Sequence, residues 1–322
     1  MTEATKQAES VGAAAAAAQP RREPPPRDAL RASRRRESVW ALGFLGPQLI
    51  GLLVFMIGPL IFALYLSFTN WTGFGERTWA GFGNYAFIFT DPQIAVSARN
   101  TVWLTVLQVP GLLLSGFIAA FFLQKAGRMT GVYRVLFFAP QVTSWVAIAA
   151  IWLWLFNPEI SPINNALAGV GIVGPDWLQD PNTVILSFAL VGVWQGIGYQ
   201  VVMFMAGLAN VPRALIEAAD IDGANGWQKL RSVTLPILSP TILFLSITSI
   251  IASFQIFDIV YVMLDTTAPS GSRTIVYEIV QIGFRQFAYG KASAIAVCLF
   301  LSLLILTGLQ LLAQRRWVYY AE

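Results

Sequence analysis

Residues 217–224, EAADIDGA, are followed, after nine residues beyond Gly223, by the tetrapeptide VTLP at residues 233–236. This polar segment lies between two long apolar stretches of a chain that is mostly apolar. Small residues beside paired acids let the backbone of another protein approach closely, and the Leu-Pro pair begins the next apolar stretch. The pattern indicates a docking surface, and the rest of the chain indicates what docks there.

The composition is typical of a protein that lies in lipid. Of the 322 residues, 56% are apolar and only 12% are charged, and the mean hydropathy is +0.61. Soluble domains carry roughly 25% charged residues. The absence of His excludes His-based metal sites, general bases and proton relays. The single cysteine, Cys298, excludes an internal disulfide.

Six apolar stretches follow one another along the chain. They run from about residue 41 to 68, 101 to 123, 132 to 156, 183 to 208, 236 to 264 and 292 to 312. Each reaches the ~20 residues that a membrane-spanning helix needs, and their continuous apolar character excludes a transmembrane barrel. The sequence therefore predicts an all-α integral membrane protein with six transmembrane helices, kinked where prolines interrupt them. These prolines are Pro47, Pro59, Pro110, Pro140 and Pro240.

The distribution of positive charge predicts the orientation. With the N-terminus in the cytoplasm, 16 of the 21 Lys and Arg residues fall on cytoplasmic segments. This agrees with the positive-inside rule, by which Lys and Arg concentrate on the cytoplasmic side. We therefore expect both termini and the 209–235 segment on the cytoplasmic side of the cell membrane. Residues 1–37 contain an alanine run, several prolines and three consecutive arginines, and are expected to form a disordered basic cytoplasmic tail. Residues 38–322 then form the six-helix domain.

Local signals predict the shape of the 209–235 segment. Residues 214–219 favour a helix, and Gly223 ends a helix or allows a close contact. Trp227 supplies an apolar anchor, and Leu235 with Pro236 begins the fifth span. We expect two short helices joined by a turn along the membrane face. Composition alone leaves an ordinary amphipathic loop as the alternative.

The spacing Glu-Ala-Ala, three residues, Gly, nine residues and Val-x-Leu-Pro resembles the EAA loop of ABC importer permeases. Beyond this spacing, the chain is similar to the carbohydrate-uptake branch, that of the maltose-type and glycerol-phosphate-type permeases. The resemblance covers about residues 40–317. The residues that carry it outside the EAA spacing are Asp220, Ile221, Asp222, Ala224, Trp227, Pro240, Phe254, Phe257, Asp258, Pro269, Phe287, Gly290 and Ala294, with Pro47, Pro59, Ser67, Phe68 and Thr69 near the start.

The resemblance implies the MetI-like fold of type I importer permeases, with a coupling helix that sits in a cleft of a cytoplasmic ATPase. Closure of two ATPase copies would move this chain and a second permease, its heterodimer partner, from inward-open to outward-open. An extracytoplasmic solute-binding protein would deliver the sugar. ATP and Mg²⁺ would be bound by the ATPase, so this chain is expected to be non-catalytic and without cofactor or metal. The residues assigned to ATPase contact are Glu217, Ala218, Ala219 and Gly223, and then Asp222, Ala224 and Trp227.

Polar residues inside spans are costly and usually face a cavity or a partner helix. Positions that resemble the sugar pocket of maltose-type permeases are found in the fourth and fifth stretches. They are Gln195, Gly196, Tyr199, Ser249, Ser253 and Asp258. Helix packing is the alternative for the small residues. The chain departs from the maltose type at Ala252 and Ser253, where larger groups are expected. Asp258, the one acid well inside a predicted span, fits a substrate or gating contact, and the alternatives are a structural hydrogen bond or a contact with the second permease.

No Lys or Arg lies deep in a predicted span, which favours a neutral disaccharide or oligosaccharide. A sugar phosphate, as in the glycerol-phosphate type, would need charges from the other permease. An ion-coupled secondary transporter is the alternative mechanism, but its inverted repeats and intramembrane carboxylates are not evident. A membrane scaffold that transports nothing is the third class, and the polar residues in the fourth and fifth stretches are less compatible with it. The phosphate-binding motif of ATPases and a basic nucleic-acid face are absent from the sequence.

Overall fold

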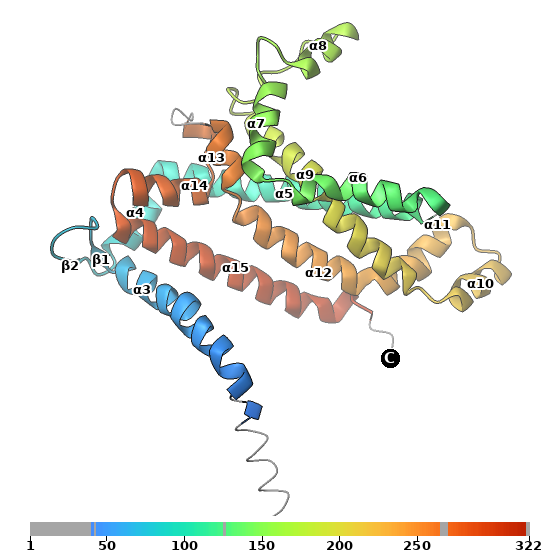
Figure 1. The fold of residues 1–322 in the computed structure, drawn as a ribbon, viewed down its shortest axis with the longest axis horizontal. Coiled ribbons are helices and arrows are strands. Elements are labelled where there is room, and N and C mark those ends of the chain that lie inside the picture. Colours follow the sequence, from blue (N-terminus) through green and yellow to red (C-terminus); the bar gives the residue numbers. More distant parts are fainter. Residues whose placement is uncertain (1–39, 42, 125–126, 265–269, 320–322) are drawn as a thin grey trace, which may run out of the picture. The chain divides into compact units, whose positions relative to one another are not determined.

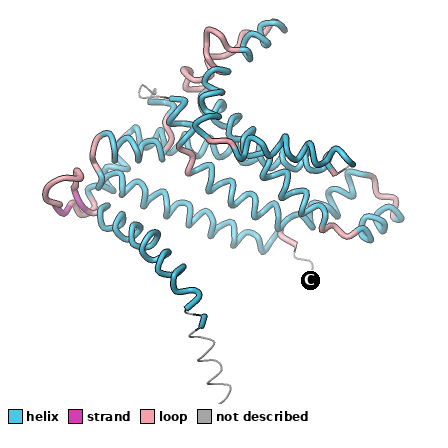
Figure 2. Tube along the Cα trace, in the orientation of Figure 1, coloured by secondary structure: helices cyan, strands magenta, loops and turns pink. Residues whose placement is uncertain are grey.

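The computed structural model describes residues 40–41, 43–124, 127–264 and 270–319, which are almost entirely helical (Figures 1 and 2). The predicted tail, residues 1–37, lies outside the described residues. The chain divides into two compact units, Met1–Ile61 and Phe62–Glu322. Five described helices are long and apolar enough to cross a membrane, and a bent helix pair adds a sixth span if it is counted as one. The prediction of a helical membrane protein is therefore confirmed.

The first unit contains most of the span Gly43–Ser67. Its residues Leu53–Ile57 form the π-helix η1, and α3, Gly58–Ser67, follows directly. Pro59 lies at the second position of α3. Proline has no backbone N–H to bond the carbonyl four residues earlier, so a wider turn just before it accommodates the missing bond. No residue of η1 is buried.

Four long helices form the centre of the second unit. They are α5, Pro92–Leu123; α9, Val184–Ala209; α12, Leu235–Phe254; and α15, Tyr289–Trp317. α9 packs along α5, α12 packs on both, and α15 contacts α12. Phe204, Leu238 and Leu245 are fully or almost fully buried between them. Pro110 lies within α5 and Pro240 within α12, as the sequence predicts.

The third apolar stretch differs from the single helix that the sequence predicts. α6, Thr130–Val142, and α7, Trp145–Leu155, meet at an angle of 97°. Thr143 and Ser144 between them are extended, and the Thr143 hydroxyl donates to the Ala139 carbonyl at 2.9 Å. Pro140 removes a further N–H from the end of α6. The polar pair and the proline together therefore end α6 and redirect the chain.

The fifth stretch is also interrupted. α12 ends at Phe254, and α13, Asp258–Leu264, begins after three residues without regular structure. Asp258 therefore lies within the candidate span Gly226–Leu264, as expected, but at a local break and at the start of a short helix. α13 packs on α7, the second half of the bent pair.

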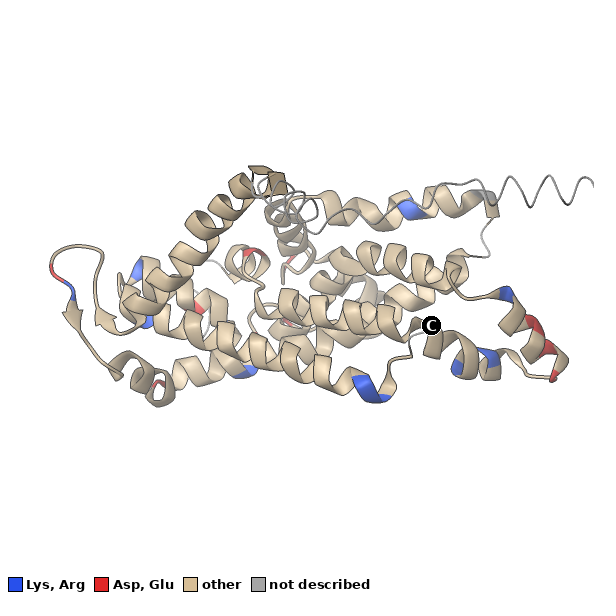
Figure 3. Cartoon of the chain, turned by 90° about the horizontal axis from the view of Figure 1, so that it is seen from below, with Lys and Arg blue, Asp and Glu red and all other residues tan. Residues whose placement is uncertain are grey.

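Short elements join the long helices at both ends. The strands β1, Thr69–Asn70, and β2, Thr78–Trp79, pair antiparallel beside α4, Gly83–Thr90, at one end, and α10, Arg213–Ile221, with α11, Gly226–Lys229, lies at the opposite end (Figure 1). The other short elements are η2, Gly127–Met129; α8, Pro162–Gly169; η3, Leu230–Thr234; η4, Ser270–Ser272; α14, Ile275–Val280; and η5, Gln281–Arg285. Most of the charged residues drawn in colour lie near the ends of the long helices (Figure 3).

A polar cluster fastens the segment before and within α14 to the first turns of α5. The Asn100 amide donates to the carbonyls of Gly271, at 2.8 Å, and Arg273, at 3.0 Å. The Glu278 carboxylate, which is 2% exposed, pairs with Arg273 at 3.3 Å and accepts from the Ser97 hydroxyl at 3.5 Å. Burial raises the pKa of Glu278, although the Arg273 charge and hydrogen bonds from neighbouring side chains oppose this.

The raised pKa predicts a pH dependence of stability. Below the ordinary value of 4.5, Glu278 is protonated in the folded and unfolded states alike. Above it the unfolded state releases the proton first, so the stability that Glu278 contributes decreases until the pH passes the folded pKa. We therefore expect the melting temperature of Glu278→Gln to rise relative to that of wild type as the pH increases through this range. A difference in melting temperature between the two proteins that does not change with pH would contradict this explanation.

Candidate functional site

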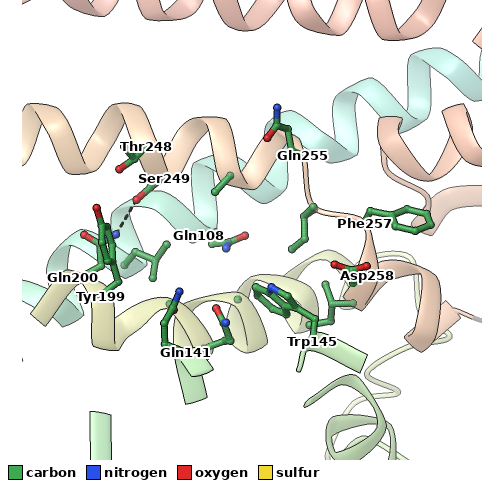
Figure 4. A pocket seen from close by; sticks show the side chains of 17 residues that line it. Gln108, Gln141, Trp145, Tyr199, Gln200, Thr248, Ser249, Gln255, Phe257 and Asp258 are labelled. Carbon is green, nitrogen blue, oxygen red and sulfur yellow. Dashed lines mark hydrogen bonds between the residues drawn. The ribbon is translucent and has the colours of Figure 1, made fainter. Parts of the chain in front are cut away.

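A polar cavity of about 420 Å³ lies in the second unit between α5, α9 and α12, and is completed by the α6–α7 bend and the α12–α13 break. Figure 4 shows Tyr199 and Gln200 at one end of the cavity, and Trp145 and Asp258 toward the other. Its volume is in the range of small-molecule sites, about 300–1,000 Å³. The other lining residues are Gln108, Leu112, Gln141, Gly192, Gln195, Gly196, Thr248, Ser249, Ala252, Gln255, Ile256, Phe257 and Ile259.

Five of the six residues that the sequence places on the substrate path line this cavity. They are Gln195, Gly196, Tyr199, Ser249 and Asp258. Ser253, the sixth, does not line it: its side chain is fully buried, and its hydroxyl lies 3.0 Å from that of Thr105 on α5. Since α12 ends one residue later, Ser253 joins two helices and does not face the cavity.

Glutamine side chains give the cavity its polar character. The Gln200 amide nitrogen donates to the Ser249 hydroxyl at 2.8 Å, which links α9 to α12 (Figure 4). The buried Oε1 atoms of Gln108, Gln141 and Gln200 have no hydrogen-bond partner in the described parts of the chain. A buried polar atom without a partner costs about 1–3 kcal/mol. These oxygens therefore suit a ligand that brings hydroxyl or amine donors.

Sequence reasoning missed the residues that α5, α6 and α7 contribute. Gln108 and Gln141 are single amides inside apolar stretches, and such isolated polar residues are the available signal for a cavity. Trp145 follows the bend, which places its ring at the cavity. The convergence itself depends on the packing of α5 and α6 against α9, which no local pattern predicts.

Two neighbouring glycines of α9 have different roles. A Cβ on Gly196 would meet only the end of the Leu112 side chain, at 2.9 Å from Cδ2. A Cβ on Gly198 would clash with the Phe137 carbonyl oxygen and lie 2.8 Å from the Phe138 Cα, both in the backbone of α6. Gly196 faces the cavity, whereas Gly198 allows α6 and α9 to pack closely.

The 209–235 segment folds as two short helices joined by a turn, which confirms the expected local shape. Gly223 has φ +75° and follows α10 in a Schellman arrangement, with the Ala224 N–H donating to the Ala219 carbonyl at 2.9 Å. The Gly223 N–H donates to the Asp220 carbonyl at 3.1 Å. Glycine is needed at this position because the left-handed conformation carries little cost without a Cβ.

The second short helix is fixed by two side-chain interactions. Asn225 and Gln228 form a capping box at the start of α11, a pattern visible in the sequence as Asn-x-x-Gln. Lys229 forms an ion pair with Asp220 at 2.6 Å, which connects α11 back to α10. The turn is therefore held in one shape by local contacts.

Most of the residues assigned to a docking role are exposed in this segment. Trp227, expected to be an apolar anchor, is 67% exposed and is therefore accessible to a partner. Glu217, Ala218, Asp222 and Gly223 are exposed, and Ala219 and Ala224 are half-buried. Since Asp220 is paired with Lys229, Glu217 and Asp222 are the acids that remain for contact with another protein. In the described parts of the chain, no group of three or more His, Cys, Asp or Glu could hold a metal ion.

Comparisons with known proteins place the chain among transport proteins. The family described as binding-protein-dependent transport system inner membrane component matches residues 111–319. The probable ABC transporter permease protein YesP of Bacillus subtilis (strain 168) is 32% identical, covering 91% of this chain and 96% of YesP. The lactose transport system permease protein LacF of Rhizobium radiobacter is 32% identical, covering 84% of this chain and 93% of LacF.

One solved structure shows the same fold. It is the crystal structure of a bacterial ABC transporter involved in the import of the acidic polysaccharide alginate, one chain of which aligns with a TM-score of 0.77 at 22% identity. The alignment covers 89% of this chain and 99% of that chain. At this identity the likeness concerns the fold.

Proposed function

Because this chain belongs to the family of binding-protein-dependent transport system inner membrane components, the permease subunits of ABC importers, we propose that it imports a sugar or sugar derivative without negative charge. The observation that carries this proposal is that α9 and α12 each run from the cavity to the 209–235 segment. A movement imposed on that segment is therefore transmitted along two helices whose side chains line the cavity.

In this mechanism the chain binds and releases sugar and performs no covalent chemistry. The glutamine amides and the Ser249 and Thr248 hydroxyls would hydrogen-bond sugar hydroxyls, while Trp145 and Tyr199 would stack on the apolar faces of sugar rings. Separation of α9 from α12 would break the Gln200–Ser249 bond and open the site. Each state of the importer would then present the cavity to one side of the membrane.

The proposed partners are those that the resemblance to ABC importers implies. Two copies of a cytoplasmic ATPase, which bind ATP and Mg²⁺, would dock on this chain and on a second permease, its heterodimer partner. The contact residues would be Glu217, Ala218, Ala219 and Gly223, with Asp222, Ala224 and Trp227 around them. An extracytoplasmic solute-binding protein would deliver the sugar.

The charge distribution supports the same orientation. If the termini and the 209–235 segment share one side, as the sequence predicts, 16 of the 21 basic residues lie on that side, which we therefore assign to the cytoplasm. Residues 38–322 would form the membrane domain. Among the relatives is the sn-glycerol-3-phosphate permease protein UgpA of Agrobacterium fabrum, 29% identical over 85% of this chain. A phosphate is less suited to this cavity, because no Lys or Arg is among its lining residues.

Copurification from the native host tests the proposal. The tagged full-length chain, extracted in mild detergent, is expected to bring a nucleotide-binding ATPase and a second permease, which mass spectrometry identifies. Reconstituted in liposomes with its binding protein, the complex should import sugar only with ATP. A chain that arrives alone, under conditions that preserve another ABC importer from the same membranes, would contradict the proposal and favour a secondary transporter.

A further inference from the structure

One ionisable carboxylate lies in the cavity without a cation beside it. Asp258 is exposed to the cavity at the start of α13, and no Lys or Arg is among the lining residues. The ion pairs of the described residues join Lys229 to Asp220 and Arg273 to Glu278, and neither involves Asp258. The Arg285 guanidinium, which is not among the lining residues, donates to the Tyr261 hydroxyl at 3.1 Å.

We infer that Asp258 sets the charge selectivity of the cavity, so that it prefers a sugar with an ammonium group over a neutral one, and disfavours a carboxylate or phosphate. This inference rests on the proposed function and names the substrate class of the same site. A carboxylate attracts an ammonium group and accepts its hydrogen bonds, whereas an anionic sugar meets a like charge with no cation to offset it.

The other polar groups do not discriminate by charge. A glutamine amide can turn its oxygen or its nitrogen toward a ligand, so Gln108, Gln141 and Gln200 can bond either donors or acceptors. Trp145 lies toward the same end of the cavity as Asp258 (Figure 4) and offers an aromatic face that also attracts a cation. Charge selection by this chain therefore depends on Asp258.

Three probes of one scaffold separate charge from shape: glucosamine, glucose and glucuronate. Their binding to the purified importer complex in lipid nanodiscs is measured by equilibrium dialysis at mildly acidic pH, where the amine is protonated and the acid ionised. We expect glucosamine to bind about tenfold more tightly than glucose, and glucuronate about tenfold more weakly, because hydrogen bonds between charged groups are stronger than those between neutral groups.

The variants assign the effect to one residue. Asp258→Asn should remove both tenfold differences while retaining glucose binding, and Asp258→Glu should keep the order of the three ligands. Glu159→Gln, which removes an exposed acid from the loop after α7, is the matched control and should behave as wild type. Retention of the wild-type order in Asp258→Asn would overturn the inference.

The same measurements distinguish a failure of the charge selectivity from a failure of the proposed function. If glucose binds and Gln200→Leu abolishes that binding, the cavity is a sugar site. Equal binding of all three probes would then overturn the charge selectivity alone. If no probe binds to the wild-type complex, the cavity is not a sugar site, and the inference falls together with the proposed function.

Discussion

The substitution Gly223→Arg should abolish sugar import while leaving the chain folded in the membrane. A Cβ at this position meets no atom within 4 Å, so an arginine has room within this chain. The φ of +75° costs a non-glycine residue about 1–2 kcal/mol. The arginine would project from the turn between α10 and α11, where the ATPase is proposed to dock. Loss of the central contacts of an interface costs about 2 kcal/mol or more, so ATPase binding should weaken about thirtyfold or more and import should be lost with it.

Gly75 provides the matched control for this experiment. It has φ +73° and equally open surroundings, but it lies between β1 and β2 at the opposite end of the long helices. Gly75→Arg should therefore retain the ATPase during copurification, whereas Gly223→Arg should lose it. The measurements are the amount of ATPase recovered per permease and ATP-dependent import in liposomes. Normal import by Gly223→Arg would rule out the assignment of the 209–235 segment to ATPase docking.

The fold could be predicted from the sequence wherever the signal is local and long. Continuous apolar stretches predict α5, α9, α12 and α15, because only helices satisfy the backbone of such segments in lipid. A kink was expected at Pro140, but the break at Thr143 and Ser144 and its angle of 97° were not predicted. Proline is tolerated in membrane helices, and whether Pro140 only kinks the helix or ends it depends on what its neighbours bond.

The candidate site was predictable only in part, for a similar reason. Gln195 and Tyr199 lie four residues apart on α9, and this spacing identifies a shared polar face. Ser249 and Ser253 have the same spacing, but Ser253 bonds to Thr105 of α5 and does not face the cavity. Which polar side chain of a helix faces a cavity and which faces a neighbour is decided by packing, which the sequence of one helix does not contain.

Gly198→Ala should have the largest effect on stability. The added methyl group would press on the Phe137 carbonyl and the Phe138 Cα, and backbone atoms of α6 cannot turn away as a side chain can. Overpacking of this kind costs about 1–3 kcal/mol. Because α6 carries Gln141 to the cavity, displacement of α6 should weaken sugar binding as well. We expect a lower melting temperature of the detergent-solubilised complex and a reduced yield.

Gly196→Ala distinguishes close packing from cavity shape. Its methyl group meets the Leu112 Cδ2 atom at 2.9 Å, the end of a flexible side chain that can change rotamer. Since Gly196 lines the cavity, this variant should keep the wild-type melting temperature and change only the affinity for sugar. Gly198→Ala should change both. Equal melting temperatures for the two variants would show that α6 and α9 have space between them, against the close backbone contact at Gly198.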